Sequence, residues 1–171
     1  GIAYVLDRLN GMVLVMVAVM GLLTALWMRR SVFKEIPEEK HGSYWAVFLL
    51  CATGYMGITI TGDVVNLYVF LEIAAISSYA LVAFGTESEE LEASFKYAVL
   101  GSVASALILL GLALLYGAFG TLNMAHLAAK LVPANVAARN AGDLVLFAKI
   151  LIVSGLALKA ALVPFHAWLP D

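Results

Sequence analysis

The sequence predicts an all-α membrane protein, a polytopic bundle of helices that cross a lipid bilayer several times. Apolar residues make up 63% of the 171-residue chain and charged residues only 13%, which is roughly half the charged fraction of soluble domains. The apolar residues gather in segments of about 20 residues, the length that a helix needs to cross the hydrocarbon core. Most charges lie in the short stretches between these segments.

Hydropathy predicts five membrane spans, and they cover residues 11–28, 44–62, 64–84, 97–119 and 144–165. We expect the first span to stop at Arg29 and Arg30. Only Asp63 separates the second span from the third, so one long kinked helix is an alternative there. A helix covering residues 44–84 would be too long to cross the bilayer once, because about 20 residues suffice. A tight helical hairpin at Asp63 is therefore the favoured interpretation.

Residues 120–143 connect the fourth and fifth spans and are richer in alanine and asparagine. Around residues 122–130 they predict a short surface helix that ends before Pro133, with His126 exposed on it. The whole chain, 1–171, is predicted to be one transmembrane region. It starts with Gly1 instead of methionine and has no cleavable signal sequence, which indicates a fragment of a longer subunit.

Two ionisable residues lie inside the predicted spans. Glu72 is in the third span and Lys159 is in the fifth, and neither is close to a predicted span end. Ionisable side chains at bilayer depth are costly, so they usually face the bundle interior and mark an ion or substrate pathway. Burial favours a neutral lysine, whereas a nearby carboxylate favours the ammonium form. A glutamate–lysine pair could therefore hold or release a proton according to its separation; a static ion pair is the alternative.

The end of the fifth span adds three further candidates. Pro164 follows Lys159 by five residues and predicts a kink or non-helical backbone within 163–170. Unwound backbone next to a charged residue recurs in ion transporters, because it can line a cavity. His166 could relay protons beyond the break. Lys149 is close enough to the start of the span to reach the interface or a hydrated outer cavity.

Composition and motifs exclude several other functions. The formal net charge of −2 offers no basic surface for nucleic acid. The sequence has no glycine-rich phosphate loop, CxxC pair or HExxH motif, so it predicts no metal site, no cofactor and no catalytic residue.

Two stretches carry a family resemblance that extends over essentially the whole chain. GDVVNLYVFLEIAAISSYALVAF (62–84) and LALKAALVPFHAWLPD (156–171) resemble the proton-conducting antiporter-like subunits of Mrp-type cation/proton antiporters, respiratory complex I and membrane-bound hydrogenases. The resemblance implies that the five spans form about one inverted repeat with a discontinuous last helix. It also implies that Glu72 and Lys159 are the central pair of that repeat, and that His166 follows the broken helix.

The predicted function is proton translocation, with sodium as a second candidate ion, by an antiporter-like subunit of a multisubunit complex in a prokaryotic plasma membrane. Its partners would be the lipid bilayer and other membrane subunits. The host would be an oxidoreductase of NADH dehydrogenase or hydrogenase type, or a cation/proton antiporter. The alternatives are a structural membrane subunit that moves no ions and, for the chain itself, a naturally split subunit.

Overall fold

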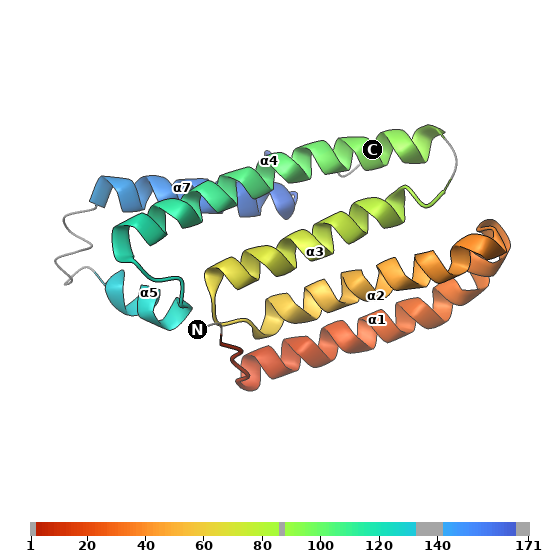
Figure 1. The fold of residues 1–171 in the computed structure, drawn as a ribbon, viewed down its shortest axis with the longest axis horizontal. Helices are drawn as coiled ribbons and strands as arrows, with labels where there is room; N and C mark the ends of the chain where they lie inside the picture. Colours follow the sequence, from red (N-terminus) through yellow and green to blue (C-terminus); the bar gives the residue numbers. More distant parts are fainter. Residues whose placement is uncertain (1–2, 86–87, 133–141, 167–171) are drawn as a thin grey trace. The chain divides into compact units, whose positions relative to one another are not determined.

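The computed structural model describes residues 3–85, 88–132 and 142–166, and over these ranges the protein is all-helical (Figure 1). Two isolated bridges, Tyr4 with Thr61 and Asp63 with Asn123, are the β-type pairings within these ranges. The helices are α1 (Arg8–Glu35), α2 (Glu38–Ile60), α3 (Val64–Val82), α4 (Ser88–Phe119), α5 (Met124–Lys130) and α7 (Gly142–Lys159).

Among the described residues, α1, α2, α3 and α4 are long and apolar enough to cross a membrane. They correspond to the first four predicted spans. The fifth predicted span also forms a helix, but α7 has only 18 residues and carries Asp143, Lys149 and Lys159. It is the shortest of the five long helices, and two of its charges, Lys149 and Lys159, lie beyond its first turn.

The connection between the first two helices differs from the prediction. Arg29 and Arg30 do not end α1, which continues through both to Glu35 and leaves only Ile36 and Pro37 before α2. The arginines end the apolar stretch but leave the backbone hydrogen bonding unchanged, since arginine is a good helix former. Hydropathy located the membrane-compatible segment correctly and the helix end incorrectly.

The hairpin at Asp63 is confirmed. The chain leaves α2 at Ile60 and enters α3 at Val64. One carboxylate oxygen of Asp63 accepts hydrogen bonds from the backbone N–H groups of Val65 (3.0 Å) and Asn66 (3.1 Å). Asp63 is thus the N-cap of α3 and satisfies N–H groups that have no partner within the helix. The short surface helix is also confirmed as α5, with His126 exposed.

Contacts divide the chain into two compact units. One comprises Val5–Ile60 and Val69–Ala98, and the other comprises Gly1–Tyr4, Thr61–Tyr68 and Val99–Asp171. α3 and α4 each contribute residues to both units.

Within the unit that contains α1 and α2, these two helices run side by side in opposite directions (Figure 1). α2 packs closely on α3 at two glycines. A Cβ atom at Gly54 would lie 2.7 Å from the backbone nitrogen of Ala74, and one at Gly57 would lie 2.2 Å from the ring of Phe70. Small residues permit such close approach of membrane helices, which associate through packing and hydrogen bonds.

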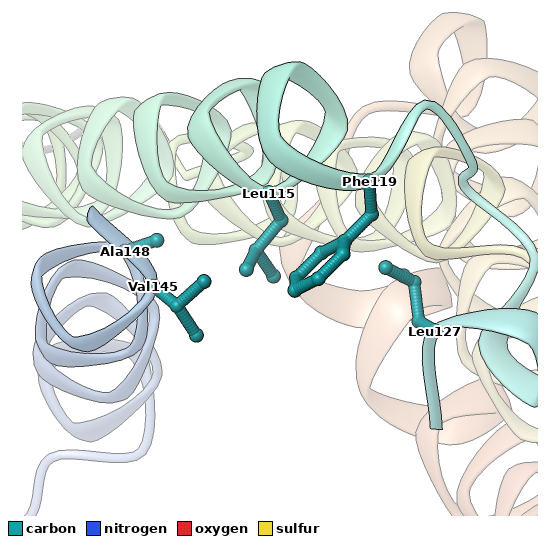
Figure 2. Close-up of a cluster of buried hydrophobic side chains, with 5 residues drawn as sticks. All are labelled: Leu115, Phe119, Leu127, Val145 and Ala148. Atoms are coloured by element: carbon teal, nitrogen blue, oxygen red, sulfur yellow. The ribbon is translucent and has the colours of Figure 1, made fainter. Parts of the chain in front are cut away.

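In the other unit, α4 packs against α5 and α7. Leu115 and Phe119 of α4 lie between Leu127 of α5 and Val145 and Ala148 of α7 (Figure 2). The contact between α4 and α7 again uses glycines. A Cβ atom at Gly155 would lie 2.6 Å from the carbonyl oxygen of Ala104 and 2.7 Å from Cγ1 of Ile108. This close packing fixes the position of α7, the helix that carries Lys159.

We predict that Gly155→Ala destabilises the protein by about 1–3 kcal/mol, the usual effect of overpacking, because backbone atoms of α4 block the added methyl group. Gly117→Ala is the matched control, since nothing lies within 4 Å of the position of its Cβ. It should be neutral or slightly stabilising, because alanine favours helix more than glycine does. Thermal unfolding of the detergent-solubilised protein measures both. Equal midpoints would contradict the close approach of α4 and α7.

Candidate functional site

Glu72 lies near the middle of α3. It is the ninth residue of a 19-residue helix, so about 12 Å of helix precede it at 1.5 Å per residue. Its side chain is half-buried within the described chain, and it has an interaction partner there. The position of Glu72 at mid-span agrees with the sequence prediction.

The helical periodicity of α3 determines the face that carries Glu72. Phe70 and Ala74 contact α2. At 100° per residue, Glu72 lies on the opposite side of α3 and shares its face with Tyr79, seven residues further on. Tyr79 contacts α4, since its ring packs edge-on against Tyr97 with centroids 4.5 Å apart. Glu72 therefore points away from α2 and lies on the same face of α3 as the contact with α4.

The structure corrects the predicted position of Lys159. This residue was expected inside a span that continued to residue 165, but it is the last residue of α7. The helix ends five residues before Pro164 and directly before Ala160, whose carbonyl the proline ring would clash with in a continued helix. Lys159 is half-buried in the described chain and has an interaction partner there.

A Schellman-type turn ends α7. The N–H of Leu162 donates to the carbonyl of Ala157 (2.9 Å), and the N–H of Ala161 donates to the carbonyl of Leu158 (3.2 Å). These two bonds define the motif, which satisfies carbonyl groups at the helix end. In this motif the residue before the last one of the turn normally adopts a left-handed conformation. Here that residue is Ala161, with φ of 50°. Glycine is usual at this position, because a Cβ atom makes the conformation costly.

The predicted non-helical backbone is confirmed for the described part of 163–170, which includes Val163, Pro164 and His166. Pro164 and His166 are exposed there. Residues 167–170, where the rest of this prediction falls, lie outside the described residues. Lys149 is exposed on α7, one helical turn from the buried Val145.

Glu72 and Lys159 belong to different compact units. We predicted that the two side chains face each other, in direct contact or through one or two waters, and this stays a prediction. The roles of His166 and Lys149 also stay predictions.

The sequence-based predictions did not include a cluster of polar side chains around Ser78, which follows Glu72 by six residues on α3. The hydroxyl group of Ser78 on α3 lies 3.4 Å from the hydroxyl of Tyr55 and 3.6 Å from the sulfur of Cys51, both on α2. Ser78 also hydrogen-bonds to Tyr97 on α4. The spacing of Cys51 and Tyr55, four residues apart, was the available signal, since it places both on one helix face.

Comparison with known proteins agrees with the family resemblance of the sequence motifs. Residues 61–171 match the family described as NADH:quinone oxidoreductase/Mrp antiporter, TM. NADH-quinone oxidoreductase subunit N of Desulforudis audaxviator is 42% identical over 171 residues, which are 100% of this chain and 33% of that protein.

The solved structures that are similar to the chain include subunits of two membrane complexes. A chain of the membrane-bound sulfane sulfur reductase, an archaeal respiratory membrane complex, is 46% identical with a TM-score of 0.77, covering 91% of this chain and 30% of that one. A chain of the Mrp complex from Dietzia sp. is 29% identical with a TM-score of 0.83, covering 98% of this chain and 30% of that one.

The long apolar helices and the match to membrane subunits define a multi-pass membrane protein. Within that class, the chain belongs to the NADH:quinone oxidoreductase/Mrp antiporter transmembrane family. It spans about a third of the length of the curated relatives that it matches. Its relatives include bacterial proteins, and its apolar helices fit a plasma membrane.

We predict that Ala161→Gly stabilises the protein by about 0.5–1 kcal/mol, because glycine adopts positive φ without the Cβ penalty and this gain exceeds its larger unfolded-state entropy. Ala161→Val should destabilise it, since a β-branched residue is disfavoured at positive φ. Thermal unfolding in detergent measures both variants. The same midpoint for all three residues at position 161 would contradict a left-handed conformation there.

Proposed function

We propose that this chain is the ion-translocating region of an antiporter-like subunit that moves protons across the plasma membrane, with sodium as the second candidate ion. Its five helices of near-span length form about one inverted repeat of the full-length subunit. In this proposal α7 is the fifth span, and the non-helical segment after Lys159 separates it from the second half of a discontinuous helix. The region works as a single domain in the assembled subunit, together with other membrane subunits.

The observation that carries this proposal is the position of Lys159 at the end of α7. The carbonyl groups of a helix C-terminus carry partial negative charge, which favours a cation there by about 0.3–1 kcal/mol at exposed sites. Removal from water acts in the opposite direction and favours the neutral lysine. A position at a helix break also allows water to reach Lys159.

Glu72 supplies a further charge in the proposed mechanism. When its carboxylate is close, Lys159 keeps its proton; when the pair separates, Lys159 releases the proton to water or to a neighbouring carrier. Moving one charge across a potential of 100 mV requires about 2.3 kcal/mol. Breaking a buried ion pair by removing one partner changes the free energy by roughly 3–5 kcal/mol. The pair therefore works on the energy scale that transport requires.

The other candidate residues take supporting roles. His166, exposed after the helix break, accepts or delivers protons there, since a histidine exchanges protons readily near neutral pH. Lys149 is exposed on α7, and its long side chain can reach the interface. It serves as an outer carrier instead of the central switch.

Substitution of the two lysines tests the proposal in the intact membrane complex. We predict that Lys159→Ala lowers proton transport to near background while the complex still assembles, because the switch loses its ionisable group. Lys149→Ala should reduce transport only mildly. Proton uptake into membrane vesicles, normalised to the amount of assembled complex, measures both. Equal and small effects would favour the structural subunit that moves no ions.

A second prediction concerns the acid. Glu72→Gln keeps the size of the side chain and removes its charge, so it should also abolish transport, whereas Glu72→Asp should retain part of it. Transport at wild-type level in Glu72→Gln would exclude the glutamate–lysine switch. Replacing sodium by choline in the same assay tests for sodium, since proton uptake that persists does not require sodium, whereas uptake that stops indicates exchange of sodium for protons.

A further inference from the structure

The polar cluster around Ser78 joins three helices through one hydroxyl group. Ser78 on α3 lies within hydrogen-bonding distance of Cys51 and Tyr55 on α2 and hydrogen-bonds to Tyr97 on α4. Its own hydroxyl donates to the carbonyl of Ala74 (2.7 Å), one turn earlier on α3. Because that proton is committed to the backbone, the oxygen of Ser78 acts mainly as an acceptor for the neighbouring side chains.

The neighbouring serine has a different environment. Ser77 is almost fully buried, with 2% exposure, and its hydroxyl donates to the carbonyl of Ile73 (2.7 Å). Both serines therefore make the same bond within α3. Ser78 differs from Ser77 in its additional contacts with α2 and α4.

Hydrogen bonds of this kind are well suited to fix the rotation of α3 about its axis. Apolar faces of membrane helices gain little from contacting each other instead of lipid, so polar bonds and close packing determine which face points where. Ser78 is bonded on both sides, and Ser94 of α4 adds a bond of 2.8 Å to the carbonyl of Tyr79. Glu72 is two turns away on the same rigid helix, so its direction follows the rotation of α3.

We propose that Ser78 is a positioning residue for Glu72: its bonds to α2 and α4 hold α3 at the rotation that points the Glu72 carboxylate away from α2. The proposal rests on the proposed function of Glu72. A carboxylate roughly 6 Å from the helix axis moves about 2 Å when the helix rotates by 20°, given a Cα radius of about 2.3 Å plus the side chain. Displacements of about 1 Å can lower the rate of a reaction up to roughly a hundredfold.

Substitutions at the two serines test the proposal in the intact membrane complex. We expect Ser78→Ala to lower proton transport per assembled complex about tenfold, because misplacement by 1–2 Å is costly. Ser78→Thr, which keeps the hydroxyl group, should restore most of it. Ser77→Ala is the matched control and should stay within about twofold of wild type, since it removes a hydrogen bond within α3 and leaves the contacts of Ser78 in place. Equal effects of Ser78→Ala and Ser77→Ala would overturn the proposal.

A second measurement separates positioning from general loss of stability. If Ser78 acts through Glu72, combining Ser78→Ala with Glu72→Asp should lower transport less than the product of the two single effects, because the shorter acid has already lost its placement. Multiplicative effects would show that Ser78 acts elsewhere. Lys159→Ala is measured in parallel. Normal proton transport in Lys159→Ala would refute the proposed function. If Lys159→Ala loses transport but Ser78→Ala transports protons at the wild-type rate, only the role of Ser78 is refuted.

Discussion

The structure depends on one constraint: backbone N–H and C=O groups at helix ends need partners, and the hydrocarbon core of a membrane offers none. Asp63 meets this need at the start of α3. At the end of α4, Gly120 adopts a positive φ of 63° and Lys130 of α5 donates to the carbonyl of Phe119 at 2.7 Å. At the end of α7, the backbone N–H groups of Ala161 and Leu162 donate to carbonyl groups of the last helical turn. Each of these three helix ends has its own set of hydrogen-bond partners.

The same constraint places the ionisable groups. Glu72 lies at mid-span, where the helix is continuous, and its face is determined by the packing of α3 on α2. Lys159 is the last residue of α7 and is partly buried. Glu72 thus lies on a continuous helix, whereas Lys159 lies where helical backbone gives way to a turn.

Hydropathy and turn chemistry predicted most of the fold. The hairpin at Asp63, the surface helix α5 and the non-helical backbone before His166 followed from local residue types. The ends of α1 and α7 did not. Arg29 and Arg30 changed the polarity without changing the backbone, and α7 stopped at a turn formed by Ala157–Leu162, where alanine takes the place of the expected glycine. Glu72 and Lys159 could be singled out because charge is rare in apolar segments. The contacts of Ser78 could not, since they depend on which faces of α2, α3 and α4 meet.

The length of α1 has a consequence for the membrane in which the protein works. Its 28 residues extend over about 42 Å at 1.5 Å per residue, whereas a typical hydrocarbon core is about 30 Å thick. None of its most apolar stretch is buried within the described chain. The uncharged stretch before Arg29, residues 11–28, extends over only about 27 Å at 1.5 Å per residue, so it matches the core and the last turns of the helix continue beyond it. α1 therefore carries Arg29, Arg30 and Lys34 as a helical extension past the hydrocarbon core, and the connection to α2 follows directly after it.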